Sequence, residues 1–238
     1  MLVAVAVLVA VAWVVVVIRS VHGSMLGQVG VRRYTKRHPT QAQVTHVSDP
    51  RARSIPGGGV SPLSNAQTVI GNATRDDLAQ ILEIYNEVIR NSTAVYSEEE
   101  FTPARGEVWF DAKTGHGFPL IVARDSSGVT GFGTFGEFRA WPCYRHSVEH
   151  SVHVRADRRG QGVGRGLVVE LLARAAAMGK HVMIAGIDAD NAVSIGLHSS
   201  LGFVRVGHFR EVGFKFGRWL DLVFMECMLP PTVDTHVK

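Results

Sequence analysis

The chain has 238 residues, 46% of them hydrophobic and 19% charged, which permits a packed core and excludes a wholly disordered protein. Its formal net charge is +4, but residues 1–68 hold seven Lys or Arg against one Asp, a net of +6, which leaves −2 for residues 69–238. The later part of the chain therefore lacks the basic excess of a nucleic-acid-binding domain. It also contains no DNA or RNA recognition motif, and we expect no nucleic-acid partner.

The first 18 residues form an uncharged apolar run, MLVAVAVLVAVAWVVVVI. A helix of this length spans about 27 Å, enough to cross the hydrocarbon core of a bilayer. Arg19 follows directly, so an inserted run would leave the rest of the chain in the cytoplasm. No charged segment precedes the run, which argues against a secretory signal peptide. Two interpretations remain open: a membrane anchor, or upstream DNA translated from a start codon placed too early.

Residues 19–67 are rich in Gly, Pro, Ser, Thr, Gln and basic residues and show no apolar period. This composition predicts a flexible linker. We expect one folded domain over residues 68–230, followed by a tail over 231–238, and a cytoplasmic location for the domain.

The first part of the domain combines a strand with two helices. A short strand is predicted over 68–73. Thr74 and Asp77 then form a capping-box pattern, with Asp in place of the usual Glu. Thr102 followed by Pro103 opens the second helix. Apolar residues at spacings of three and four mark the buried face of the first helix: Leu78, Ile81, Leu82, Tyr85, Val88 and Ile89.

The remaining elements complete a mixed fold. The order of elements is β-α-α-β-β-β-α-β-α-β-β, and three consecutive strands between helices exclude a regular doubly wound sheet. An α+β domain with a mixed sheet fits this order better. Strands are predicted over 118–124, 129–138, 147–154, 181–187, 203–211 and 220–229, and helices over 164–178 and 191–201.

A glycine-rich turn separates the strand over 147–154 from the helix that follows. Glycines at 160, 162, 164 and 166 expose backbone N–H groups just before a helix N-terminus. Such a turn is an anion site suited to a pyrophosphate. The spacing fits neither a GxGxxG dinucleotide fingerprint nor a GK[ST] phosphate loop.

The same turn contains the pattern [RQ]xxGx[GA], as Arg159-Gly-Gln-Gly-Val-Gly164, and resembles the acetyl-CoA loop of the GNAT superfamily of N-acetyltransferases. The segment from Asn191 to Phe203 resembles the second signature of that superfamily. The resemblance implies a mostly antiparallel central sheet flanked by helices and acetyl-CoA as co-substrate. It places the following residues against acetyl-CoA: Val152, His153, Val154, Arg159, Gly160, Gln161, Gly162, Val163, Gly164, Arg165, Asn191 and Ser194. We expect no metal, because no Cys and no nearby acid pair beyond Glu149 completes a site around His146, His150 and His153.

Longer local matches resemble the phosphinothricin and methionine sulfoximine or sulfone acetyltransferases within that superfamily. They are Ile84-Tyr-Asn86 and the segments 131–139, 144–152 and 213–221. The strand reads Val-His-Val over 152–154 where that family usually has Val-Tyr-Val. This resemblance implies a small amino-acid-like acceptor and a homodimer.

Two residues match the catalytic positions that the resemblance implies. Glu149 matches the proposed base, and an amine needs one because only its unprotonated form attacks a thioester. His198 stands where many superfamily members have Tyr, and a His can assist proton transfer near pH 7. The backbone N–H groups of Val152 to Val154 are candidate donors to the developing oxyanion.

Arg139 and Arg145 are the candidate residues for gripping an anionic acceptor, because a guanidinium holds a carboxylate, phosphinate or sulfone through paired hydrogen bonds. Phe135, Phe138 and Trp141 are candidates for the pocket wall, or alternatively core residues. Neither Cys143 nor Cys227 lies in a CxxC pair, so no zinc site is indicated. The alternatives are a GNAT enzyme that acetylates peptide or protein N-termini, and a non-catalytic acyl-CoA-binding module.

Overall fold

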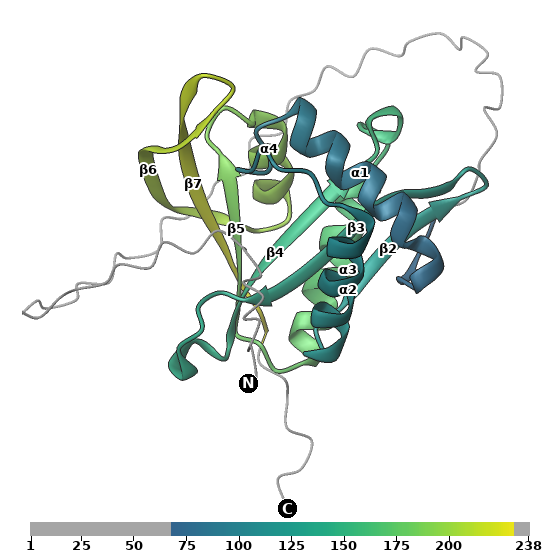
Figure 1. Ribbon diagram of the computed structural model, residues 1–238. Helices are drawn as coiled ribbons and strands as arrows, with labels where there is room; N and C mark the ends of the chain where they lie inside the picture. Colours follow the sequence, from purple (N-terminus) through teal and green to yellow (C-terminus); the bar gives the residue numbers. More distant parts are fainter. Residues whose placement is uncertain (1–67, 231–238) are drawn as a thin grey trace, which may run out of the picture. The chain divides into compact units, whose positions relative to one another are not determined.

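The computed structural model describes residues 68–230, and the segments 1–18, 19–67 and 231–238 assigned from the sequence lie outside that range. A seven-stranded sheet in the order β1-β2-β3-β4-β5-β7-β6 forms the centre (Figure 1). Only β4 and β5 are parallel, so the predicted α+β, mostly antiparallel architecture is confirmed. The strands are β1 (Val69–Asn72), β2 (Leu120–Asp125), β3 (Gly128–Glu137), β4 (Ser147–Val154), β5 (Val182–Asp188), β6 (Val204–Lys215) and β7 (Arg218–Met228). The helices are α1 (Leu78–Asn91), α2 (Pro103–Gly115), α3 (Val163–Ala177) and α4 (Ala192–Ser200).

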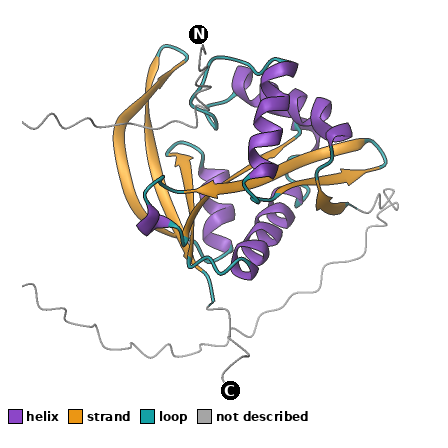
Figure 2. Ribbon diagram, turned by 60° about the horizontal axis from the view of Figure 1, so that its bottom comes forward, coloured by secondary structure: helices purple, strands orange, loops and turns teal. Residues whose placement is uncertain are grey.

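The sheet is covered on both faces (Figures 1 and 2). On one face, α1 and α2 pack over a cluster that includes Ile81, Phe110 and Phe132. On the other, α3 packs over a second cluster that includes Leu167 and Leu171. Because successive strand residues point to opposite faces, the apolar run of β2 fills both clusters.

The capping box predicted before the first helix is present. The Thr74 N–H donates to Asp77 Oδ2 at 2.6 Å, within a short 3-10 turn that leads directly into α1. Arg124 of β2 donates to the same carboxylate through its Nε at 3.0 Å. Burial raises the pKa of Asp77, but these hydrogen bonds outweigh burial and the pKa ends below its ordinary value. The cap therefore ties the start of α1 to the sheet.

The last hairpin differs from the prediction. We expected its strands to end at residue 211 and to restart at 220, but β6 runs to Lys215 and β7 starts at Arg218. The register shifts between Phe209 and Gly213, which places a bulge in β6, and residues 213–215 and 218–219 of the expected loop pair as strand instead. The turn is the two residues Phe216 and Gly217, both with positive φ.

Strands β4 and β5 separate after a short parallel contact (Figure 1). Their pairing covers Ser147 with Val182 through Glu149 with Ile184. Beyond it, β4 continues along β3 to Val154, and β5 continues along β7 to Asp188. The sheet is therefore open between the second halves of β4 and β5, and the edge of β4 faces this opening.

Candidate active site

Alternate residues of β4 present their backbone to the opening. The Phe138 N–H donates to the Ser147 carbonyl at 3.2 Å, and the Arg155 N–H donates to the Thr130 carbonyl at 2.9 Å. In an antiparallel ladder, every second residue forms backbone hydrogen bonds with the neighbouring strand. The residues of this segment that form them with β3 are therefore 147, 149, 151, 153 and 155. The polar backbone groups of Val152 and Val154 point the other way, into the opening. Those of His153 face β3, and its ring is buried beside Tyr85 and Phe132.

The glycine turn forms the end of the opening where α3 begins. Gly160 and Gly162 have φ values of 75° and 83°, a region that favours glycine, and α3 starts at Val163, one residue before the prediction. A Cβ at Gly160 or Gly162 would meet no atom within 4 Å. The space over the loop is therefore open, and the first N–H groups of α3 suit a pyrophosphate.

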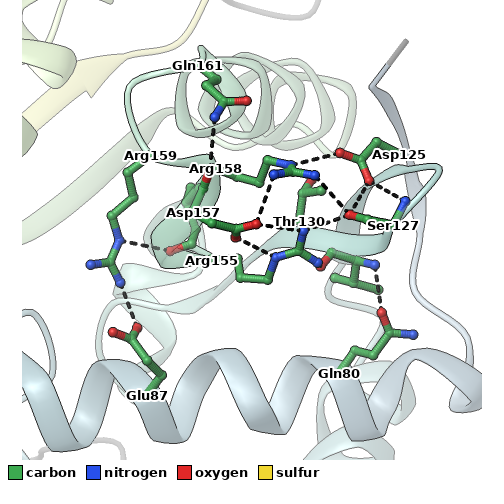
Figure 3. Close-up of polar contacts among 12 residues, drawn as sticks. Gln80, Glu87, Asp125, Ser127, Thr130, Arg155, Asp157, Arg158, Arg159 and Gln161 are labelled. Atoms are coloured by element: carbon green, nitrogen blue, oxygen red, sulfur yellow. Dashed lines mark hydrogen bonds and ion pairs between the residues drawn. The ribbon is translucent and has the colours of Figure 1, made fainter. Parts of the chain in front are cut away.

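A network of charged side chains holds this loop, and the sequence reasoning missed it (Figure 3). Arg155 donates to the Val129 carbonyl at 3.0 Å and to Asp157 at 2.7 Å. Arg158 donates to Asp125 at 2.9 Å. The network ties the residues before the loop to the β2–β3 hairpin. The only signal in the sequence was the dense charge of the segment from Arg155 to Arg159.

Arg159 does not point over the loop. Its Nε donates to the Val154 carbonyl at 3.1 Å, and its Nη2 pairs with Glu87 of α1 at 2.7 Å (Figure 3). Among the other predicted cofactor residues, Gln161 donates to the Asp157 carbonyl, and Arg165 donates to Ser200 of α4. These side-chain hydrogen bonds hold the loop in place, and the contacts of Arg159, Gln161 and Arg165 with the cofactor stay a prediction.

Asn191 and Ser194 form the N-terminal cap of α4. The Asn191 side-chain oxygen accepts the Ser194 N–H at 3.0 Å. Helix α4 starts at Ala192, one residue after the prediction, and the cap accounts for Asn at position 191. The cofactor contacts predicted for these two residues stay a prediction.

Glu149 lies where β4 and β5 begin to separate, and it is half-buried. Gly136 is its direct partner on β3, and a Cβ at Gly186 of β5 would lie 3.0 Å from Glu149 Oε1. Two glycines thus leave space on both sides of the carboxylate. Burial raises the pKa of Glu149 against the opposing effect of two cations, first Arg139 and then Lys113. This is the environment of a general base.

His198 is buried against a second histidine that the sequence reasoning did not assign to the site. The two Nε2 atoms of His198 and His150 are 3.1 Å apart, and His198 Nδ1 lies 2.7 Å from the Ser194 carbonyl. A carbonyl only accepts, so Nδ1 of His198 carries the proton, and its Nε2 accepts from His150 Nε2–H. The remaining atom, His150 Nδ1, is buried without a partner in residues 68–230.

Burial keeps both rings of this pair neutral. It lowers the pKa of His150 to about 3, with further lowering by His198 and His153. It also lowers the pKa of His198, although the hydrogen bond to Ser194 acts in the opposite direction. His150 follows the period-2 pattern of Val148 and Val152, which was the available signal that it faces the core.

The predicted acceptor residues lie in different places. Phe135 is fully buried in the core under α3 and does not line the opening, which corrects its assignment to the pocket wall. Trp141 is 72% exposed. The Arg139 guanidinium stacks on the Phe138 ring at 4.0 Å and acts electrostatically on Glu149. Arg145 is exposed, and only Arg139 of the two is coupled to Glu149 by charge.

Neither a metal centre nor a membrane-spanning helix is found in residues 68–230. No three His, Cys, Asp or Glu side chains gather there to hold a metal. His146 instead contacts the Gly179 carbonyl at 3.2 Å. No helix in that range is long and apolar enough to cross a bilayer.

Comparison with known proteins agrees with this geometry. The family of the acetyltransferase (GNAT) domain matches residues 70–224. A methionine sulfoximine/methionine sulfone acetyltransferase of Pseudomonas aeruginosa is 48% identical over 157 residues, covering 66% of this chain and 91% of that protein. A phosphinothricin N-acetyltransferase of Alcaligenes faecalis is 39% identical, covering 63% of this chain and 77% of that protein. The crystal structure of a phosphinothricin acetyltransferase of Sinorhizobium meliloti with acetyl-CoA is similar, with a TM-score of 0.67 and 37% identity, over 71% of this chain and 96% of that one.

Proposed function

The chain belongs to the GNAT acetyltransferase family and is an acetyl-CoA-dependent N-acetyltransferase, and we propose that its acceptor is the α-amine of a small amino acid of the methionine sulfoximine, methionine sulfone or phosphinothricin type. One observation carries the assignment of the site. Glu149 lies between two glycines at the point where β4 and β5 separate, beside the backbone edge that leads to the glycine turn. The proposed base Glu149, the backbone that would contact the thioester and the turn that would bind the pyrophosphate then follow one another along β4.

Glu149 takes the proton from the acceptor amine. The amine attacks the thioester carbon only as the free base, and the carboxylate has no protein hydrogen bond within residues 68–230 that it must give up first. The attack places negative charge on the thioester oxygen. The Val152 N–H, which faces the opening, is the proposed donor to that oxygen.

His198 is the second proposed catalytic residue, as a source of the proton for the leaving thiolate. Its Nε2 accepts a hydrogen bond in this structure and holds no proton, so in the proposed role the Nε2–Nε2 contact opens and Nε2 takes up a proton before passing it to the thiolate. His198→Phe keeps the ring packing. A loss of kcat of ~10²-fold or more with little change in the KM for acetyl-CoA supports this role, and an unchanged kcat contradicts it.

A homodimer through β6 and β7 is also proposed. β6 is an edge strand, and this hairpin exposes a group of large apolar side chains. Exposed edges and apolar patches of this kind are typical of interfaces. The side chains are Val204, Val206, Phe209, Val212, Phe214, Phe216 and Trp219. Analytical ultracentrifugation of the wild type and of Phe214→Glu tests this proposal, with a dimer expected for the first and a monomer for the second.

The function is tested by following thiol release from acetyl-CoA with the full-length chain and a panel of acceptors. The three proposed amino acids are expected to exceed simple amines and short peptides by an order of magnitude in kcat/KM. In the same assay Glu149→Gln is expected to lower turnover ~10²-fold or more at pH 7, with acetyl-CoA binding nearly unchanged. Peptides as the best acceptors would contradict the amino-acid acceptor. An active Glu149→Gln variant would contradict the assignment of the base.

A further inference from the structure

Lys113 lies beside Glu149 and belongs to neither the glycine turn nor the acceptor loop. It occupies the last turn of α2, and its Nζ is 3.1 Å from the point where a Cβ of Gly136 would stand. Gly136 is the direct partner of Glu149 on the neighbouring strand. Side chains of directly opposite residues leave the same face of a sheet, with Cβ atoms roughly 5 Å apart. The ammonium thus stands over the vacant side-chain position next to the carboxylate.

The two charges face each other without closing an ion pair. No acid within residues 68–230 lies within 4.0 Å of the Lys113 nitrogen, and no hydrogen bond to it is formed there. Both groups are half-buried, so the intervening space is poorly screened. Burial lowers the pKa of Lys113, and Glu149 opposes that effect. The Glu149 carboxylate is therefore not occupied by an ion pair with Lys113, while the cation still acts on it electrostatically.

Few other charges act on Glu149. Arg139 reaches it from the segment after β3. On the opposite side, Ile184 and Gly186 of β5 carry no charge. Lys113 is therefore one of two cations that compete with burial, and it is the one mounted on a helix rather than on a loop.

We propose that Lys113 is a positioning residue of the active site, whose ammonium keeps Glu149 in the carboxylate form that accepts the proton of the acceptor amine. This inference rests on the proposed function. An opposite charge within ~4–6 Å of a carboxyl group lowers its pKa by about 1 to 3 units. Since the pair is separated and half-buried, the lower end of that range applies. Lys113 thus extends activity to lower pH.

The test is the pH profile of kcat/KM for thiol release with methionine sulfone, in wild type and Lys113→Met. Without the cation, Glu149 stays protonated to a higher pH, so the acidic limb of the profile is expected to move up by about one unit. Well below both midpoints this is a loss of roughly tenfold, whereas on the plateau the rates agree within about twofold. Both proteins use the same acceptor, so the titration of its amine cancels in the comparison.

Three further variants separate charge from structure. Lys113→Arg keeps the cation, and its limb is expected to stay near that of the wild type. Gly136→Ala puts a methyl group 3.1 Å from the ammonium nitrogen, a contact tight enough to displace the ammonium, and is expected to move the acidic limb in the same direction by a smaller amount. This variant tests the proposal if Lys113→Met does not fold. Arg90→Met removes an exposed cation of α1 and is expected to leave the profile unchanged.

Two results would overturn the role of Lys113. One is a folded Lys113→Met variant whose acidic limb coincides with that of the wild type. The other is a rise in the KM for methionine sulfone by the same factor at every pH, which would mean that Lys113 grips the acceptor rather than setting the charge of Glu149. Failure of the proposed function is distinguishable, because then the wild type itself releases no thiol with any amino acid of the panel.

Discussion

Neighbouring residues determine the protonation state and the accessibility of the side chains in the site. Glu149 has space because its neighbours Gly136 and Gly186 lack side chains, and it has a raised pKa because it is half-buried. His150 and His198 are kept neutral by burial and hold each other in one tautomeric arrangement. The same residue types on an exposed strand would have their ordinary pKa values and would not form a binding site.

At this scale the two arginines are expected to differ. Arg139 acts on Glu149 from a half-buried position, and Arg145 is exposed. A charge-assisted hydrogen bond contributes ~1.5–3 kcal/mol, so Arg139→Ala is expected to raise the KM for methionine sulfone by roughly ten- to a hundredfold. Arg145→Ala is expected to have the smaller effect, and Arg139→Lys to recover little because a point charge lacks the paired geometry. Initial rates over a range of acceptor concentrations measure this, and equal effects of the two alanine changes would contradict the ranking.

The histidine pair predicts acid sensitivity of the fold. The pKa of His150 is about 3 in the folded protein against 6.5 unfolded, so the unfolded chain binds the extra proton between these values. The free energy of unfolding therefore falls as the pH drops below about 6.5, by up to ~1.4 kcal/mol per unit for one such group. Urea titrations at pH 7 and pH 5 measure the free energy of unfolding. The decrease in this free energy from pH 7 to pH 5 is expected to be smaller for His150→Phe than for wild type. The exposed His116→Gln serves as the control, and it is expected to match the wild-type difference.

At the scale of elements, the site lies where strands β4 and β5 cease to pair. β4 and β5 share only the stretch from Glu149 back to Ser147, and the backbone beyond it bonds no second strand. The glycine turn places the N-terminus of α3 at the end of the free edge of β4. The Arg155–Asp157–Arg158 network connects that turn to the β2–β3 hairpin. Cofactor binding is thus expected to depend mainly on backbone groups.

Gly164 tests this dependence with little risk to the fold. It lies in the first turn of α3 without the positive φ of Gly162, and an acid is tolerated at a helix N-terminus. Gly164→Asp is expected to weaken acetyl-CoA binding at least ~10-fold, because it puts a negative charge where the pyrophosphate meets the N–H groups. Gly164→Asn, the neutral isostere, is expected to weaken binding less. Calorimetry measures both affinities, and equal affinities of the aspartate variant and the wild type would rule out a pyrophosphate at this turn.

At the scale of the whole molecule, every group assigned to the chemistry lies within residues 68–230. Two core clusters, one on each face of the sheet, consist of residues within that range. The basic excess of the chain lies outside it, in residues 1–68. Catalysis and the fold of the domain are therefore expected to be independent of the apolar run at the N-terminus.

Deletion of residues 1–67 tests that independence. The shortened chain is expected to unfold cooperatively and to keep kcat/KM within about twofold of the full-length value, because the deleted residues supply none of the proposed chemistry. Circular dichroism and the thiol-release assay measure this. Loss of the fold on deletion would mean that the domain begins earlier than residue 68. Fractionation of the full-length chain with membranes separately distinguishes the two interpretations of residues 1–18.

The sequence by itself determined the order of elements and the glycine turn, because these depend on local periodicity and on short motifs. Glu149 was singled out by the resemblance to a known family. The sequence did not reveal Lys113, His150 or the Arg155–Asp157–Arg158 network, since each acts across elements that are distant in the chain. It also left Phe135 between pocket and core, and the tertiary structure placed it in the core, because the face of β3 on which it lies is covered by α3. Only the separation of β4 from β5 decided which backbone groups are available. Pairing depends on how neighbouring strands twist and pack, and a single strand's residue pattern does not encode it.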